Sequence, residues 1–277
     1  MILSIIQARM ASSRLPGKVL LDIAGVPMLQ RVVERARLAE TVDEVVVATT
    51  IDPSDELVAE FCSALGYPFT RGSVHDVLDR YVQTARRFKA DRVVRLTADC
   101  PLLDPGLVDA TVNLLINRTE DGGRSPVFRP PSPVLDFAAN RLPPPWGRTY
   151  PIGLDVEVAT LAALERAWEE TAEKHHREHV MPYCYDDLPA EPLEAGRVYT
   201  TPRGFRVAQL HHTTDHGAIR WTVDTPEDLA AVRALTERLP PDFTWLDALR
   251  IWERHPEIAR TNAGVRHKTA LDIDERS

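Results

Sequence analysis

The sequence contains no long apolar run, no closely spaced cysteine pair and no excess of basic charge. No stretch approaches the roughly 18–20 apolar residues that a helix needs to cross a bilayer, so no membrane segment is predicted. The N-terminal MILSIIQARM is typical of a strand that starts at once and not of a signal peptide. Cys62, Cys100 and Cys184 are widely spaced and odd in number, which indicates reduced thiols and a cytoplasmic protein.

The charge balance excludes one class of partner. The chain carries 33 Lys and Arg against 41 Asp and Glu, a formal net charge of −8. A general nucleic-acid-binding surface is basic, so we expect no nucleic-acid partner. A few cations gathered in one cleft still suffice for a polyphosphate. Neither a Walker A loop nor a GxGxxG fingerprint occurs, so any nucleotide site must be built differently.

The first ~120 residues alternate short apolar runs with amphipathic segments. Apolar runs at 2–8, 44–49 and 92–96 are typical of buried strands, another short strand is expected to end at Arg71–Gly72, and each precedes a segment with helical spacing. A capping box of Ser73 and Asp76 is expected to start the third helix. This order predicts an α/β fold: a Rossmann-like, doubly wound and mainly parallel sheet. The loops 8–18, 71–76 and 97–104 follow strands directly, so they should converge on one crevice.

The rest of the chain is less regular. Residues 121–149 are rich in proline and are expected to be an irregular excursion. Strands are then predicted at 154–159, 205–210 and 218–223, and helices after Thr160, within 177–185, after Thr225 and from Thr244. We divide the chain into a nucleotide-binding half (1–120), an inserted segment for acceptor binding, a lid or dimerisation (121–200), a return to the α/β core (201–264) and a polar tail (265–277).

The loop after the first strand, QARMASSRLPGK, carries the strongest chemical signal. Three cations and two hydroxyls lie within ten residues: Arg9, Ser12, Ser13, Arg14 and Lys18. Backbone amides, Arg and Lys are the donors that hold polyphosphates. The alternative is a solvated basic loop.

Two acidic loops complete the pattern. Asp99 follows the strand at 92–96 in TADCPLLDP, and Asp224 follows the expected strand at 218–223 in WTVDTPEDL. A carboxylate at a strand end facing phosphates suits Mg²⁺. The alternative for each is a helix-capping charge, and we favour that reading for Asp104 and Asp228.

Together these motifs resemble a family. The run IIQARMASSRLPGKVLLDIAGVPML is similar to the start of the cytidylyltransferases that make CMP-activated acidic sugars, including CMP-KDO and CMP-sialic acid synthetases. RGSVHDVLDRY, RLTADCPLLDP, TYPIGLDVEV, REHVMPY and VDTPEDL resemble the SpsF-like branch, named for spore-coat polysaccharide synthesis. The resemblance covers residues 1–240 and implies transfer of CMP from CTP to an acidic sugar or related anionic acceptor, with Mg²⁺ as cofactor, by a homodimer.

The resemblance also assigns roles. It implies Arg14, Lys18, Asp99 and Asp224 as catalytic residues, the two aspartates holding the metal. The nucleotide is expected at Ala8, Arg9, Ser12, Ser13, Arg14, Lys18, Arg71, Ser73 and Asp76. The acceptor is expected at Tyr150, Asp155, Glu157, Arg177, Glu178 and His179.

Other functions stay open at this point. One is another nucleotidyltransferase that forms a nucleotide-sugar, although its expected GxGxR start is lacking. Others are a glycosyltransferase-like domain, CTP transfer to a phosphonate, and a nucleotide-binding regulator without turnover. The histidines at 175–179 and 211–216 lack the Cys or HExxH partners of a zinc site, so we predict surface histidines there.

Overall fold

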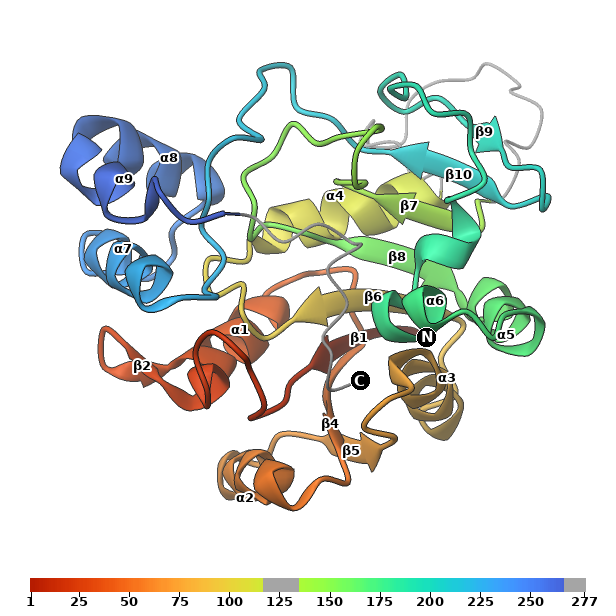
Figure 1. Cartoon of the computed structure of the whole chain (residues 1–277), viewed down its shortest axis with the longest axis horizontal. Helices are drawn as coiled ribbons and strands as arrows, with labels where there is room; N and C mark the ends of the chain where they lie inside the picture. Colours follow the sequence, from red (N-terminus) through yellow and green to blue (C-terminus); the bar gives the residue numbers. More distant parts are fainter. Residues whose placement is uncertain (117–134, 267–277) are drawn as a thin grey trace.

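The computed structural model describes residues 1–116 and 135–266. The expectations for 117–134 and for the tail 267–277 lie outside these residues. Figure 1 shows a central sheet flanked by helices. The eight strands lie in the order β5-β4-β1-β6-β8-β7-β10-β9. Their bounds are β1 (Ile2–Gln7), β4 (Glu44–Thr50), β5 (Phe69–Gly72), β6 (Arg92–Thr97), β7 (Phe137–Ala139), β8 (Glu157–Thr160), β9 (Tyr199–Thr200) and β10 (Arg206–Gln209).

The first four strand–helix units form as predicted. β1 pairs in parallel with β4 on one side and with β6 on the other, and β4 pairs in parallel with β5. The helices that follow these strands are α1 (Met28–Ala36), α2 (Glu56–Leu65), α3 (Val77–Arg87) and α4 (Pro105–Ile116). Short pieces lie between them: the 3₁₀ turns η1 (Lys18–Leu20) and η2 (Pro53–Asp55), and the hairpin of β2 (Asp22–Ile23) and β3 (Val26–Pro27).

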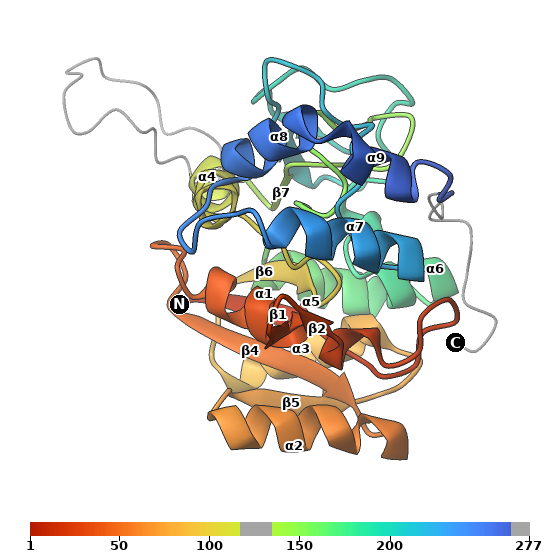
Figure 2. The ribbon, with the colours of Figure 1, turned by 90° about the vertical axis from the view of Figure 1, so that its left-hand side faces the viewer.

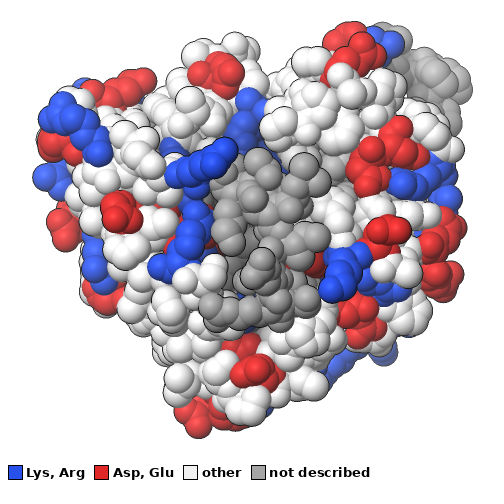
Figure 3. Space-filling view, viewed as in Figure 1, with Lys and Arg blue, Asp and Glu red and all other residues white. Residues whose placement is uncertain are grey.

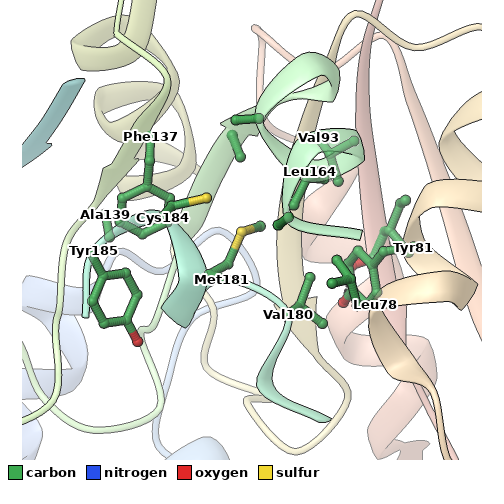
Figure 4. Packing of buried hydrophobic residues seen from close by; sticks show 14 of the residues in the cluster. Leu78, Tyr81, Val93, Phe137, Ala139, Leu164, Val180, Met181, Cys184 and Tyr185 are labelled. Carbon is green, nitrogen blue, oxygen red and sulfur yellow. Dashed lines mark hydrogen bonds between the residues drawn. The ribbon is translucent and has the colours of Figure 1, made fainter. Parts of the chain in front are cut away.

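Alternate residues of the parallel strands pack into two separate hydrophobic cores, one on each face of the sheet. Ile6, Val47 and Leu96 pack with α1, α2 and α4 on one face. Leu3, Val46 and Val93 pack on the other face with α3 and α5 (Leu161–Glu170). Figure 4 shows Leu78 and Tyr81 of α3, Val93 of β6 and Leu164 of α5 in this second core. Helices on both faces confirm the predicted α/β class, with a mixed, mostly parallel sheet.

The remaining strands run in both directions. β8 is antiparallel to both β6 and β7, and β10 is parallel to β7 but antiparallel to β9. Thus the segment 121–200, expected to be an insertion, contributes β7, β8 and β9 to the main sheet. β7 also shows that 135–149 is not wholly irregular: its three residues are fully buried between helices and neighbouring strands.

The C-terminal helices build a third core. α7 (Pro226–Thr236), α8 (Trp245–Arg254) and α9 (Pro256–Asn262) pack around Leu235, Ala248 and Ile258, together with Ile23 and Met28. Figures 1 and 2 show the three helices side by side, beyond the edge of the sheet where β1 and β6 end. They therefore lie next to the crevice predicted from the sequence.

Several sequence predictions are wrong in detail. Residues 218–223 form no strand; a single bridge joins Arg220 to Ile152. The cap of α3 is Asp76, whose side chain accepts from Asp79 N, and not Ser73. The helix expected within 177–185 starts earlier, as α6 (Lys174–His179), and breaks at Val180, which has φ 72°. The 3₁₀ turn η3 (Pro182–Cys184) follows.

Candidate active site

The loop after β1 folds back on itself and thereby aims Lys18 into the site. Gly17 N donates to the Met10 carbonyl at 2.9 Å, and Met10 N donates to Asp55 Oδ1 at 2.6 Å. Gly17 has φ 70°, in the left-handed region that favours glycine, and it directly precedes η1, which begins at Lys18. The basic loop is therefore ordered by backbone bonds before any ligand is considered.

Lys18 joins the two predicted acidic loops. Its Nζ donates to Asp99 Oδ2 at 2.7 Å, to Asp224 Oδ1 at 2.8 Å and to the Val223 carbonyl at 2.9 Å. Asp99 follows β6 and Lys18 follows β1, the two adjacent strands from which the chain winds in opposite directions. This is the switch point of a doubly wound sheet, where ligands bind. The structure therefore brings together three residues that are far apart in the sequence.

Asp224 contacts three cationic side chains. Its Oδ2 accepts from Arg14 at 2.9 Å and from Arg220 at 2.7 Å, while Oδ1 faces Lys18. Burial would raise the pKa of Asp224, but Lys18, Arg14 and Arg220 outweigh it and hold the pKa well below the ordinary 3.8. Burial would lower the pKa of Lys18, yet Asp99 and Asp224 raise it above 10.5. Both groups are thus charged at neutral pH.

These shifts predict how stability depends on pH. The contribution of Asp224 is complete above the unfolded pKa of 3.8 and is lost as the pH falls below that value. The contribution of Lys18 is complete below 10.5 and is lost as the pH rises beyond it. In metal-free buffer, the urea midpoint of the wild type should therefore exceed that of Asp224→Asn by a constant margin between about pH 5 and 9. The margin should shrink at pH 3, and a margin that grows there would contradict the assignment.

A cavity of about 590 Å³ opens beside this cluster. It is large enough for a nucleotide with a small second substrate. Its walls include Arg9, Ser12, Ser13, Arg14 and Lys18 from the first loop, with Asp99 and Asp224 in contact with that loop. On the face drawn in Figure 3, Lys and Arg side chains gather near the middle of the molecule. A smaller cavity of about 140 Å³ shares Gln7 and Arg9 with it and is also lined by Ala8 and Arg80.

The far wall of the large cavity is built from one buried and two partly buried ion pairs. Arg95 of β6 pairs with Glu157, which lies directly across from it on β8. Arg141 and Arg148 face each other across a tight proline-containing turn, and both lie near Asp155. The Nε atoms of Arg95 and Arg141 have no hydrogen-bond partner among the described residues. Buried donors of this kind are costly unless a ligand pairs with them, so this wall is suited to an anion.

The predicted site residues divide into two groups. Those that line the large cavity are Arg9, Ser12, Ser13, Arg14, Lys18, Asp99, Glu157, Glu178, His179 and Asp224. Ala8 lines only the smaller cavity. The other predicted residues, Arg71, Ser73, Asp76, Tyr150, Asp155 and Arg177, line neither of these two cavities.

Local contacts occupy this second group. Arg71 pairs with Glu56 and donates to the Thr50 carbonyl. Arg177 pairs with Asp76 and donates to the carbonyls of Trp168 and Thr171. The remaining members also contact neighbouring residues. Ser73 Oγ accepts a hydrogen bond from Asp76 N before α3, the Tyr150 ring packs against Trp245, and Asp155 Oδ1 accepts from Arg148. Arg71, Ser73, Asp155 and Arg177 thus direct polar atoms to neighbouring protein groups, and the nucleotide- and acceptor-binding roles of this group stay predictions.

Sequence reasoning missed the cavity arginines. Arg95 interrupts an otherwise apolar strand in RVVRL, which is itself a signal of a buried pair. Arg141 and Arg148 flank the prolines of RLPPPWGR, where no periodic pattern marks them. Among the described residues, no group of three or more His, Cys, Asp or Glu side chains is placed to hold a metal ion.

Basic loop, paired carboxylates and cavity meet at the switch point of a doubly wound sheet, an arrangement that fits enzymes acting on nucleotides. The cytidylyltransferase family model matches residues 3–243, and the chain belongs to this family.

Individual relatives support the assignment over most of their length. The spore coat polysaccharide biosynthesis protein SpsF of Bacillus subtilis is 28% identical, with 93% of this chain and 96% of that protein covered. A 3-deoxy-manno-octulosonate cytidylyltransferase of Marinobacter nauticus is 31% identical, with 84% and 96% covered. The solved structure of a cytidylyltransferase from Leptospira borgpetersenii superposes with a TM-score of 0.78 at 28% identity, covering 96% of this chain and 99% of that one. Among the described residues, no helix has both the length and the apolarity to cross a bilayer.

Proposed function

We propose that the protein transfers CMP from CTP to a small anionic acceptor, an acidic sugar, and releases pyrophosphate. The observation that carries the proposal is the contact of Lys18 Nζ with both Asp99 and Asp224, at 2.7 and 2.8 Å. Simple nucleotide binding does not need two carboxylates beside a phosphate loop, whereas phosphoryl chemistry with a divalent cation does. The B. subtilis and M. nauticus relatives, by their names, support an acceptor of the sugar-acid type.

The two aspartates fit Mg²⁺. Carboxylate oxygens that approach one ammonium from two sides are near enough to share one cation, and Mg²⁺ is commonly held by one or two carboxylates together with substrate phosphates. Asp99 and Asp224 would hold it. Bound there, Mg²⁺ would offset the negative charge that develops on the phosphate oxygens.

The residues of the chain supply the rest of the mechanism. Arg9, Arg14 and Lys18 orient the triphosphate, with the hydroxyls of Ser12 and Ser13 on the same wall. The acceptor oxygen attacks the α-phosphorus and loses its proton, while the bond to the β-phosphate oxygen breaks and pyrophosphate leaves. Arg14 and Lys18 stabilise the charge that accumulates on the departing pyrophosphate.

The direct test measures pyrophosphate release with Mg²⁺ and each of CTP, UTP, GTP and ATP against a panel of acidic sugars and phosphonates. Release that requires CTP and one acceptor is the expected result. Release of a nucleoside diphosphate would instead favour a glycosyltransferase-like reaction. No turnover and no CTP binding would overturn the proposal.

The far wall of the large cavity, which contains Arg95, Arg141 and Arg148, predicts where the acceptor anion binds. Arg141 Nε lies 3.4 Å from Asp155 Oδ2 without forming a hydrogen bond, so its guanidinium has donor capacity to spare. Arg141→Lys should raise the KM for the acceptor about tenfold or more, because a bidentate guanidinium is replaced by a point charge. The KM for CTP should change little. Steady-state kinetics with each substrate varied in turn will check this, and an effect on CTP alone would place the acceptor elsewhere.

We also propose a cytoplasmic homodimer. Cys62, Cys100 and Cys184 are buried and unpaired, which supports a reducing compartment. Ile51, Leu57 and Leu65, in and next to α2, are large apolar side chains that remain exposed by 64%, 52% and 41%. Such surfaces favour association. Light scattering of the full chain at micromolar concentration tests for the dimer.

A further inference from the structure

Asp224 is held differently from the other metal-binding candidate. Asp99 follows β6, a strand paired on both sides, so the sheet fixes its backbone. The segment before Asp224 forms no strand: a bridge joins it to Ile152, Val223 N and Thr222 Oγ1 donate to the Asp99 carbonyl at 2.9 and 3.2 Å, and its own carbonyls accept from the side chains of Lys18 and Asn262. The position of the Asp224 carboxylate therefore depends on side chains.

A chain of buried hydrogen bonds leads away from Asp224. Arg220 donates to Asp224 Oδ2 at 2.7 Å. The same guanidinium forms two hydrogen bonds to Asp228: Nε donates to Oδ1 at 2.8 Å, and a terminal nitrogen donates to Oδ2 at 2.9 Å. Asp228 Oδ2 also accepts from the backbone N of Asp224 at 3.0 Å. Asp228 thus fixes both the main chain of Asp224 and, through Arg220, its carboxylate.

The last link comes from the C-terminal helix α9. Asn262 Nδ2 donates to Asp228 Oδ1 at 3.0 Å and to the Arg220 carbonyl at 3.1 Å. Both partners are acceptors, so the amide must present its NH₂ group to them. Asn262 is 3% exposed, Arg220 6% and Asp228 0%, which keeps water from substituting for these bonds. Burial alone would raise the pKa of Asp228, but the hydrogen bonds from Arg220 and Asn262 lower it.

We propose that Asn262 is a positioning residue, through which helix α9 fixes the carboxylate of Asp224 for divalent-metal binding with CTP. The inference rests on the proposed function. Figure 2 shows α9 packed beside α7, the helix that begins directly after Asp224 and Thr225. Beyond α9 the chain returns to the same site, since Arg14 donates to the Arg266 carbonyl at 3.4 Å. The end of the described chain therefore contacts the basic loop.

The test compares four variants of the full chain: Asn262→Ala, Asn262→Asp, Ile258→Ala and Asp224→Ala. Asn262→Asp keeps the side-chain shape but removes the NH₂ donor. Ile258 lies on the same helix, is 3% exposed and packs in the apolar core, so Ile258→Ala weakens α9 without touching the polar chain. Mn²⁺ binding to each protein in the presence of CTP is measured by electron paramagnetic resonance, together with calorimetric titration of metal-free CTP and the thermal midpoint.

Both Asn262 variants should weaken Mn²⁺ binding about tenfold, the usual scale for a residue that supports a metal ligand. Their affinity for metal-free CTP should stay within twofold of the wild type. Ile258→Ala should lower the thermal midpoint at least as much yet leave Mn²⁺ affinity within twofold. Unchanged Mn²⁺ affinity in Asn262→Ala, or an equal loss in Ile258→Ala, overturns the positioning role alone. Undiminished Mn²⁺ binding by Asp224→Ala overturns this role and the proposed metal site together.

Discussion

Asp224→Asn is expected to lower kcat/KM for CTP by about 10²–10³-fold, the scale seen when one electrostatic stabiliser of a transition state is removed. The variant keeps the shape of the side chain but removes its charge. Lys18, Arg14 and Arg220 all contact this carboxylate, so its loss leaves three cations around one neutral amide. Affinity for metal-free CTP should be retained or should increase, because the triphosphate then meets more uncompensated positive charge. Pyrophosphate release and calorimetry measure the two effects.

A matched control is Asp247→Asn. Asp247 also lies at a helix N-terminus, where it caps α8, but it does not line the large cavity. Its replacement should lower the thermal midpoint slightly and leave kcat/KM within twofold. If Asp224→Asn, purified and folded, turned over CTP at the wild-type rate, the catalytic role of Asp224 would be wrong.

Glu157→Ala should cost about 3–5 kcal/mol of unfolding free energy, the scale for breaking a buried ion pair by removing one partner. Glu157 is 3% exposed, and its partner Arg95 is 9% exposed. Burial would lower the pKa of Arg95, but Glu157 raises it, so the guanidinium stays charged. Removal of Glu157 therefore leaves a buried positive charge without its ion-pair partner. Urea unfolding at pH 7 measures the loss.

Two further variants separate burial from charge. Glu165→Ala breaks the ion pair between Glu165 and Arg86, whose side chains are 33% and 41% exposed. This change should lower the free energy of unfolding by less than about 1 kcal/mol. The double variant Arg95→Leu/Glu157→Leu removes both buried charges and should recover most of the stability lost by Glu157→Ala. Equal losses for Glu157→Ala and Glu165→Ala would contradict a burial effect.

Local signals in the sequence were sufficient for the parallel half of the sheet. β1, β4 and β6 are short apolar runs buried on both faces, β5 is a short, mostly half-buried edge strand, and a helix follows each of the four along the chain. This order fixes the doubly wound topology and hence the crevice at the strand ends. Lys18 and Asp99 meet there, as their places after β1 and β6 predict.

The binding roles that the motif resemblance predicts for Arg177 and Asp76 stay predictions. Arg177 and Asp76 sit in matching motifs, but they pair with each other at 3.2 Å and line neither cavity. No sequence pattern distinguishes an arginine that binds a substrate from one that holds a helix, because both need the same donors.

The sequence by itself determined the α/β class, the first basic loop and the place of Asp99 after a strand, since periodicity and strand-end positions are local properties, whereas the strand expected before Asp224 does not form. Only the tertiary structure decided that Arg95, Arg141 and Arg148 form the opposite wall of the cavity, because they meet through β8 and a proline-containing turn. It also decided that Asp224 is held by Arg220, Asp228 and Asn262 and not by a strand. The bonds of Arg220 and Asp228 are local, but Asn262 reaches Asp228 and Arg220 across 34 and 42 residues, so they meet only because helix α9 packs against this segment.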